Sequence, residues 1–184
     1  WDVASTNCLG SIDDGTGKWS EGYIADNAHP NTAGHQEFFH SIVPSLFDAI
    51  KAGKAQPVRD TAKSATLEAG KKLCFVPEDV AHPFTLSLRV KGTEGELLTV
   101  NTPDGVATVR VNADGTVTFT SVHCTTIHSS TAINDDAWHY VTLTSYYAAG
   151  RTLLYVDKTK AGELAERMGQ IGEIRVGDNA HIRD

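Results

Sequence analysis

An aspartate and a histidine lie three residues apart in the chain, Asp26 and His29, and Pro30 follows them. A histidine that takes a proton from a hydroxyl nucleophile needs a carboxylate to accept the hydrogen bond of Nδ1–H, which leaves Nε2 free. Residues three apart in a turn or a first helical coil point to the same side. Pro30 restricts His29 to extended or turn conformations. The spacing is compatible with Asp26 orienting a catalytic His29, although such a pair is more often a solvated part of a polar loop.

An amphipathic helix is predicted directly after this pair, over residues 32–52. Asn31 and Thr32 are suitable N-caps, Pro44 should kink the helix, and Gly53 should end it. Its apolar residues recur at intervals of three and four, so they form one wide stripe. The stripe packs on the rest of the chain or on a partner, or else stays exposed. It consists of Phe38, Phe39, Ile42, Val43, Leu46, Phe47 and Ile50.

The block Asp26-x-x-His29-Pro30-Asn31, with Gly34-His35 and the helix after it, resembles the last conserved block of the SGNH (GDSL-type) hydrolases. In that family the Asp and the His complete a Ser-His-Asp triad, which implies that Asp26 and His29 are catalytic residues of a serine esterase. The family's nucleophile lies in a Gly-Asp-Ser motif, which this sequence does not contain. The resemblance therefore implies a partner, an upstream SGNH catalytic domain, and a chain that is inactive alone.

The apolar period changes to two from residue 72 onward, as in half-buried strands. Phe84, Leu86, Leu88 and Val90 alternate with polar residues. Asp104-Gly105 and Asp114-Gly115 are hairpin turn signals. Many short strands separated by turns predict a mainly β fold, a two-sheet antiparallel jelly-roll sandwich. The further strands are expected at 97–101, 107–111, 117–119, 138–146, 153–156 and 173–176.

Two segments, 136–143 and 150–157, resemble the paired central strands of laminin-G/concanavalin-like domains, and 171–177 resembles the strand that follows. Such domains close with a strand that pairs back near the first. Here that strand is either cut off or formed by His181–Arg183. We expect three parts in the chain: residues 1–56 as the C-terminal remnant of an SGNH domain, 57–71 as a linker or a short first strand with its loops, and 72–184 as the sandwich.

Laminin-G-like domains often bind glycans or calcium, and often only pack against a neighbouring enzyme domain, so the resemblance leaves these roles open. A sugar site needs aromatic faces for the apolar side of the ring. Trp19, Tyr146 and Tyr147 are the candidates, the two tyrosines because they precede an expected hairpin tip. Trp138 is expected in the core instead.

No cofactor is expected, although calcium is possible because carboxylates lie at several strand ends. Each of these carboxylates is also a typical turn former. They are Asp104, Asp114, Asp157 and Asp178. No pair of cysteines has metal-ligand spacing; Cys74 and Cys124 are the candidate disulfide pair, and Cys8 is left over.

The charge of the chain argues against a nucleic-acid surface, because 23 acidic residues oppose 16 basic ones and leave a net charge of −7. No apolar run is long enough for a membrane span. The resemblances imply a periplasmic or secreted protein. The leading hypothesis is the C-terminal part of an SGNH-type esterase that carries a β-sandwich accessory domain. The alternative is a carbohydrate-binding or purely structural laminin-G-like module.

Overall fold

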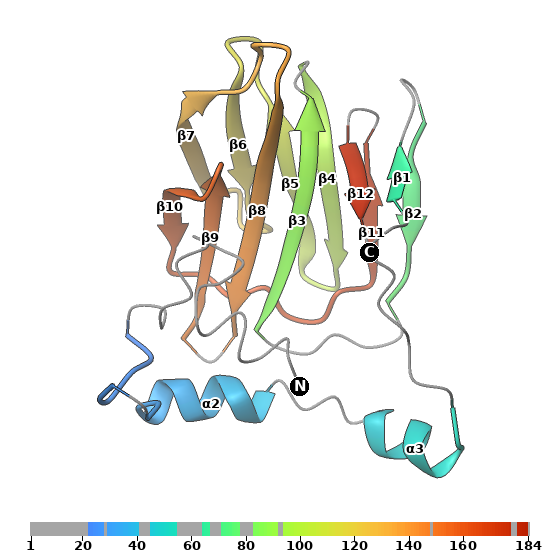
Figure 1. Cartoon of the computed structure of the whole chain (residues 1–184), viewed down its shortest axis with the longest axis vertical. Coiled ribbons are helices and arrows are strands. Elements are labelled where there is room, and N and C mark those ends of the chain that lie inside the picture. Colours follow the sequence, from blue (N-terminus) through green and yellow to red (C-terminus); the bar gives the residue numbers. More distant parts are fainter. Residues whose placement is uncertain are drawn as a thin grey trace.

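In the part of the chain that the structure describes, two six-stranded antiparallel sheets pack face to face (Figure 1). The structure, a computed structural model, describes residues 22–27, 29–40, 45–54, 64–66, 71–77, 83–91, 94–147, 149–177 and 180–183. The first sheet has the strand order β1-β12-β3-β8-β9-β10, and the second has the order β2-β11-β4-β5-β6-β7. The strands are β1 (Ser64–Thr66), β2 (Leu73–Phe75), β3 (Phe84–Lys91), β4 (Gly95–Thr102), β5 (Gly105–Val111), β6 (Thr116–Thr120), β7 (Thr126–Ala132), β8 (Trp138–Tyr146), β9 (Arg151–Val156), β10 (Thr159–Leu164), β11 (Glu173–Val176) and β12 (Ala180–Arg183).

Alternation along each strand decides which side chains face the core. On β3, Phe84, Leu88 and Val90 are buried between the sheets, while Ser87 and Arg89 face outward and are exposed. The inner faces of the two sheets share one continuous apolar core. Each fully buried aliphatic side chain stabilises the fold by about 1.5–3 kcal/mol relative to an exposed one. The prediction of a mainly β, two-sheet sandwich is confirmed.

Two hairpins close where the turn signals predicted them. Gly105 begins β5 with a φ of 143°, and Gly115 lies between β5 and β6 with a φ of 82°. A Cβ at Gly115 would also collide with the side chain of Asn134. Glycine is therefore required at position 115 both by the backbone conformation and by the space around it.

Strands β7 and β10 are not predicted by the apolar pattern. Both are edge strands, so much of their surface faces solvent. On β7 the buried side chains are Ile127 and Ser129, and β10 carries a register shift between Lys160 and Gly162. A strand with so few apolar positions gives no clear period of two.

The chain closes the first sheet with β12, which pairs with both β3 and β1. The expectation of a final strand at His181–Arg183 is confirmed. Strand β1 lies inside the segment 57–71, so this segment contributes a short strand to the sheet as well as connecting residues.

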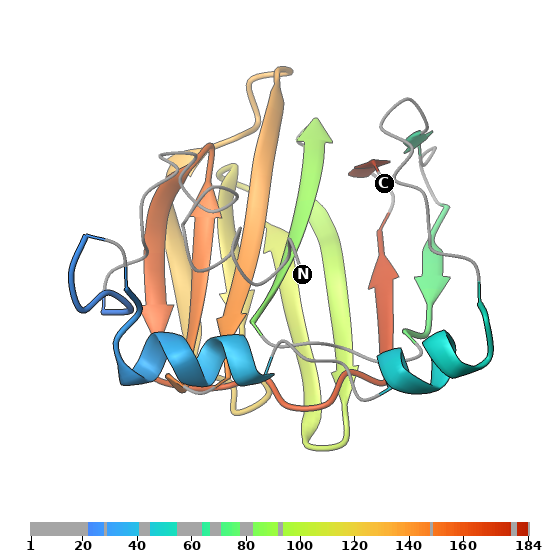
Figure 2. The ribbon, with the colours of Figure 1, turned by 60° about the horizontal axis from the view of Figure 1, so that its bottom comes forward.

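Two helices, α2 (Thr32–His40) and α3 (Ser45–Lys51), lie along one end of the sandwich (Figure 2). The side chain of Asn31 caps α2, because its Oδ1 accepts a hydrogen bond from Gly34 N at 3.0 Å. Gly53, with a φ of 64°, ends α3 as predicted. The single helix expected over 32–52 is described as two helices, and Pro44 lies outside the described residues. Neither described helix is long and apolar enough to cross a membrane.

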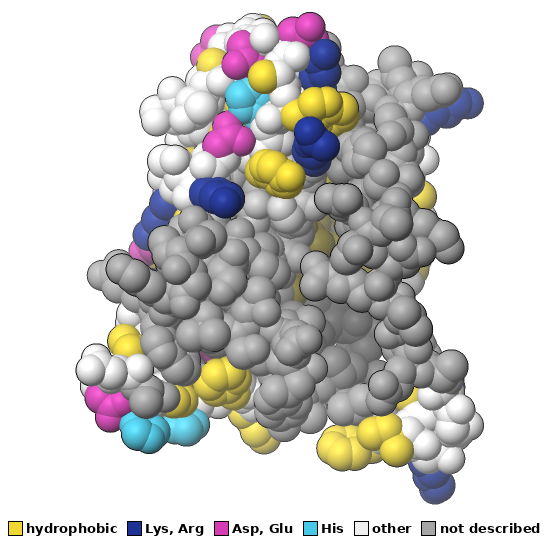
Figure 3. Space-filling model, viewed as in Figure 1, with side chains coloured by type: hydrophobic (Ala, Val, Ile, Leu, Met, Phe, Trp, Pro, Cys, Tyr) yellow, Lys and Arg dark blue, Asp and Glu magenta, His cyan; other side chains and the backbone are white. Residues whose placement is uncertain are grey.

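Three residues of the predicted apolar stripe are largely in contact with solvent. The exposed fractions are 70% for Phe39, 64% for Phe47 and 66% for Ile50. Hydrophobic side chains are visible at the lower edge of Figure 3, over α3. Phe39, Phe47 and Ile50 do not pack on the β-rich part of the chain. For these three residues, the first of the three expected alternatives is therefore excluded.

The two described cysteines are free and exposed. Cys74 lies on β2 and Cys124 in the turn between β6 and β7, toward opposite edges of the second sheet. Neighbouring strands are about 4.8 Å apart, whereas a disulfide requires Cα atoms within about 7 Å. The predicted Cys74–Cys124 bridge is therefore wrong. Cys8 lies outside the described residues.

Candidate functional site

The first candidate site is the Asp26–His29 pair. The Nδ1 atom of His29 lies 2.9 Å from both carboxylate oxygens of Asp26, and the backbone N–H of His29 donates to Asp26 Oδ1 at 2.9 Å. In the neutral ring this contact places the proton on Nδ1, so Nε2 is the atom able to accept a proton. The structure thus brings together the two residues that the spacing paired; their catalytic role stays a prediction.

The loop that carries the pair, which we call the dyad loop (residues 22–27 and 29–31), is closed by its own backbone. Ile24 and Pro30 form an antiparallel bridge, and Asn31 N donates to Tyr23 O at 3.0 Å. The side chain of Asn31 adds a second closure, because its Nδ2 donates to Gly22 O at 2.7 Å. These contacts all lie within residues 22–31, and they define the closed form of the loop.

The pair itself lies in water. The side chains of His29 and Asp26 are 75% and 61% exposed. Within the described part of the chain, Asp26 is the hydrogen-bond partner of the His29 ring, and no serine hydroxyl reaches it. The described residues therefore present a base and its orienting carboxylate without a nucleophile.

The second candidate site is an aromatic surface on the outer side of the first sheet. Trp138 and Tyr140 occupy alternate positions of β8 and are 42% and 49% exposed. Arg89 and Lys91 of β3 lie opposite Tyr140 and Trp138 in the strand register. We call these four residues the aromatic face; large hydrophobic and basic side chains gather there near the top of Figure 3.

Charges on the aromatic face are held in defined positions. The guanidinium carbon of Arg89 lies 4.9 Å from the ring centroid of Trp138, a cation–π contact. The ammonium group of Lys91 pairs with Asp136 at 2.9 Å. Among the described residues no carboxylate pairs with Arg89. The expectation that Trp138 lies in the core is wrong, because its position in the strand alternation faces outward.

A histidine between two carboxylates fixes this end of β8. The His139 ring is 12% exposed; its Nδ1 lies 2.6 Å from Asp157 and its Nε2 2.8 Å from Asp135. Burial disfavours the charged ring, but hydrogen bonds to Asp135 and Asp157 outweigh it and raise the pKa of His139. The hydrogen bond from His139 lowers the pKa of Asp135. Only an imidazolium can donate to both carboxylates at once.

Asp157 also binds the backbone of the aromatic face. Its Oδ1 accepts a hydrogen bond from Tyr140 N at 2.8 Å. Asp157 and Lys158 form the turn between β9 and β10, with φ values of 49° and 67°. The loop at Asp135, the turn at Asp157 and the start of β8 are thereby joined through His139.

The sugar-binding residues predicted from the sequence are placed differently. Tyr146 is 1% exposed and stacks on Tyr23 at a centroid distance of 4.9 Å, so it has no open ring face. Tyr147 is partly buried, with Arg167 5.0 Å from its centroid. The expected exposure of Tyr146 is wrong because a segment distant in sequence covers it. Trp19 lies outside the described residues.

The described candidate calcium ligands either form hydrogen bonds within turns or pair with a histidine. Asp114 accepts hydrogen bonds from the hydroxyl and the backbone N–H of Thr116, and these bonds lower its pKa. Asp104 lies in the turn after Thr102. Across the described residues no three His, Cys, Asp or Glu side chains are grouped to hold a metal ion. Asp178 lies outside them.

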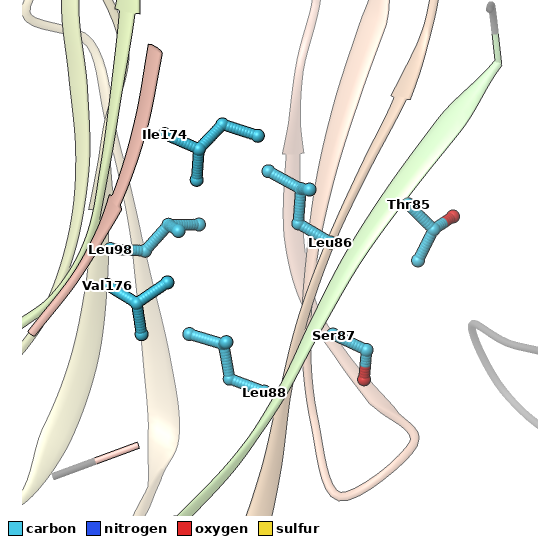
Figure 4. Close-up of a pocket in the computed structure, with 7 residues that line it drawn as sticks. All are labelled: Thr85, Leu86, Ser87, Leu88, Leu98, Ile174 and Val176. Carbon is cyan, nitrogen blue, oxygen red and sulfur yellow. The ribbon is translucent and has the colours of Figure 1, made fainter. Parts of the chain in front are cut away.

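A cavity of about 180 Å³ lies between the sheets. Leu86 and Leu88 of β3 face Leu98, Ile174 and Val176 across it (Figure 4). The hydroxyls of the two polar residues at its wall, Thr85 and Ser87, point away from the space and bond to threonines of β8. With no polar side chain directed into it, the cavity is a gap in the apolar core and offers no group for catalysis.

Comparison with known proteins finds the fold but no close relative. No protein-family model and no curated protein matches the chain. Domains LG4-5 of the mouse laminin alpha1 chain are similar in structure, with a TM-score of 0.50 and 16% identity over 67% of this chain. This chain spans 39% of that laminin chain.

Two other solved structures are less similar. A heptameric SAP-like pentraxin from Limulus polyphemus has a TM-score of 0.48 and 15% identity, covering 71% of this chain and 76% of its own. The galectin LEC-6 of Caenorhabditis elegans has a TM-score of 0.46 and 13% identity, covering 65% of this chain and 91% of its own. From the laminin comparison and the strand order together, we conclude that the chain has the laminin-G-like β-sandwich fold.

Proposed function

We propose that the β-sandwich binds a glycan on the aromatic face. The observation that carries the proposal is the exposure of Trp138 and Tyr140 at alternate positions of one strand. Alternate residues of a strand are roughly 7 Å apart, so the two rings offer one extended apolar platform. Sugar rings present an apolar side to such platforms, and their hydroxyls need polar partners at the rim. Arg89 and Lys91 supply donors there.

The residues around Trp138 and Tyr140 favour a role of these two rings in binding rather than in folding. The His139 network fixes the backbone at Tyr140, which reduces the ordering cost on association. Exposed aromatic side chains of this size contribute little to stability where they are. A rigid face that combines two aromatic rings with basic donors suits a sugar ring, which has an apolar side and a rim of hydroxyls.

A calorimetric titration tests this proposal, with ligands selected on a glycan array in the presence and absence of calcium. Trp138→Ala should weaken binding about tenfold or more, since one ring contact is worth about 1.4 kcal/mol or more. Val106→Ala is the matched control, because Val106 is 49% exposed on the second sheet. Unchanged affinity in Trp138→Ala, or no binding to any glycan, rejects the proposal.

We also propose a catalytic role for the Asp26–His29 pair, as base and orienting carboxylate of an SGNH-type esterase whose serine comes from an upstream domain. The observation that favours it is the 2.9 Å contact of His29 Nδ1 with Asp26. The substrate class would be an ester, such as an acetyl group on a glycan. Such an enzyme would act in the periplasm or outside the cell.

The exposed stripe of α2 and α3 fits this second proposal. Phe39, Phe47 and Ile50 are each more than 60% exposed, and apolar surface of this kind commonly marks an interface. In the proposed enzyme the upstream domain would cover this stripe and bring its serine to His29.

The test is hydrolysis of p-nitrophenyl acetate by a longer protein that includes the upstream domain. His29→Ala should lower kcat on the order of 10⁴-fold or more, since a triad fails when its base is removed. His35→Ala is the control, because His35 is an exposed residue of α2 outside the pair. Activity that survives His29→Ala would show that His29 is not the base.

A further inference from the structure

Tyr23, near the start of the dyad loop, attaches the loop to the sandwich. Tyr23 is 1% exposed, and its ring stacks on Tyr146 with centroids 4.9 Å apart and planes at 30°. The guanidinium of Arg151 lies 5.5 Å from the centroid of the same Tyr23 ring. Leu153 and Tyr155 complete this small buried cluster, which is separate from the main core. Both Tyr146 and Arg151 flank the turn between β8 and β9, which we call the β8–β9 hairpin (residues 146–147 and 149–151).

A buried carboxylate joins α2 to the same hairpin. Glu37 is 0% exposed. Its Oε1 accepts hydrogen bonds from Ala149 N at 3.1 Å and, over a longer distance of 3.4 Å, from the Tyr23 hydroxyl. A carboxylate costs free energy when it is buried, unless donors face it. Glu37 therefore gives α2 a polar contact with the hairpin that an apolar side chain could not make.

Few residues separate Tyr23 from the Asp26–His29 pair. The carbonyl of Tyr23 accepts the N–H of Asn31, and Gly34 packs so closely on it that a Cβ there would collide. The bridge between Ile24 and Pro30 comes next. Asp26 follows Ile24 by two residues, and His29 precedes Pro30 directly. Tyr23 and the Asp26–His29 pair are thus parts of one small hydrogen-bonded turn.

We infer that the β8–β9 hairpin holds the dyad loop closed, with Tyr23, Glu37 and Tyr146 as positioning residues for the Asp26–His29 pair. An exposed ion pair is weak because water competes for both partners and the side chains lose rotamer freedom. The pair is exposed, so its geometry depends on a backbone that is fixed elsewhere. The anchor on the sandwich supplies that constraint. For its chemical purpose the inference rests on the proposed esterase role.

The test uses the chain itself and reads the His29 ring by long-range ¹H–¹⁵N correlation spectra at one fixed pH. In the wild-type chain His29 should show a ring protonated at Nδ1 and bonded to a carboxylate. Glu37→Met, which keeps the length of the side chain but removes the oxygen that accepts from Ala149 N and the Tyr23 hydroxyl, and Tyr146→Leu should both shift His29 toward the Nε2-protonated form of a free imidazole. Tyr140→Leu is the matched control, because it removes an exposed tyrosine from the same strand and should leave His29 unchanged.

Amide signals of Val109 and Phe119 in the second sheet report whether each variant is folded. A wild-type His29 signature in folded Glu37→Met would overturn the inference, and so would a free imidazole in the wild-type chain. If Tyr146→Leu unfolds, Glu37→Met alone decides. Neither readout requires hydrolysis or glycan binding, so a failure of the proposed functions remains distinguishable from a failure of this inference.

Discussion

Large apolar side chains are buried in the β-sandwich, whereas several of them are exposed on helices α2 and α3. In the sandwich, Val90 and Leu154 are 0% exposed, and the period of two is satisfied by the facing sheet. On the helices, Phe47 and Ile50 are more than 60% exposed. A period of 3.6 predicts an apolar face, but it does not say what covers that face. The sandwich therefore holds its own core, whereas the helices present a surface for contact.

The two candidate sites lie at opposite ends of strand β8. The aromatic face lies at the start of β8, where this strand is paired with β3. The dyad loop docks at the other end of this strand, through Tyr146. Positions 138 and 146 are roughly 25 Å apart along a strand. A ligand on one site would not block the other.

The largest effect is expected from a substitution in the core of the sandwich. Leu154→Ala should lower the free energy of unfolding by about 2–5 kcal/mol, because it removes buried contacts and leaves a cavity. Ile50→Ala on α3 should change it by less than about 0.5 kcal/mol, as exposed positions do. Urea denaturation followed by circular dichroism measures both. Equal losses would show that the helical stripe is buried in solution.

A smaller effect is expected from the histidine that joins the loops around the aromatic face. His139→Gln should cost about 1–3 kcal/mol, because a neutral amide cannot replace two charge-assisted hydrogen bonds. The pKa of His139 is raised in the folded chain, so its contribution is complete below the ordinary histidine pKa of about 6.5. That contribution is lost as the pH rises through the raised value.

Thermal denaturation from pH 5 to pH 9 checks this prediction. The wild-type chain should lose stability toward alkaline pH relative to His139→Gln, so that the difference between the two shrinks. A difference that grows with pH would mean that His139 is held neutral in the fold.

The smallest effect on stability is expected on the aromatic face itself. Trp138→Ala should change the free energy of unfolding by less than about 1 kcal/mol, because the ring is 42% exposed and its cation–π contact with Arg89 is a surface contact. The same substitution should weaken glycan binding about tenfold. A large loss of stability would place Trp138 among the structural residues, as the resemblance to laminin-G-like domains implied.

Much of the sandwich could be predicted, because alternation and turn chemistry are local signals. The strands at 84–91 and 138–146 and the hairpin at Gly115 follow from them. The edge strands β7 and β10 could not, since they carry few apolar positions. The contact between Asp26 and His29 could also be predicted, because a three-residue spacing forms it within one turn.

The burial of Tyr146 could not be predicted from the sequence. Trp138 and Tyr146 occur in the same strand at positions of the same parity, so alternation places both on the outer side. Tyr146 is buried there in a cluster with Tyr23, which lies more than a hundred residues earlier and stacks on it. No local pattern contains that information, and the burial of Glu37 depends on the same long-range docking.

The central claim is that the outer side of the first sheet binds a glycan while the second sheet does not. The most direct measurement is a ¹H–¹⁵N spectrum recorded during titration with a glycan selected on the array. We expect the indole N–H signal of Trp138 and the amide signals of Arg89 and Tyr140 to shift together and saturate, while the amide signals of Val106 and Phe119 stay in place. Shifts confined to the second sheet, or none in the Trp138 indole, would contradict it.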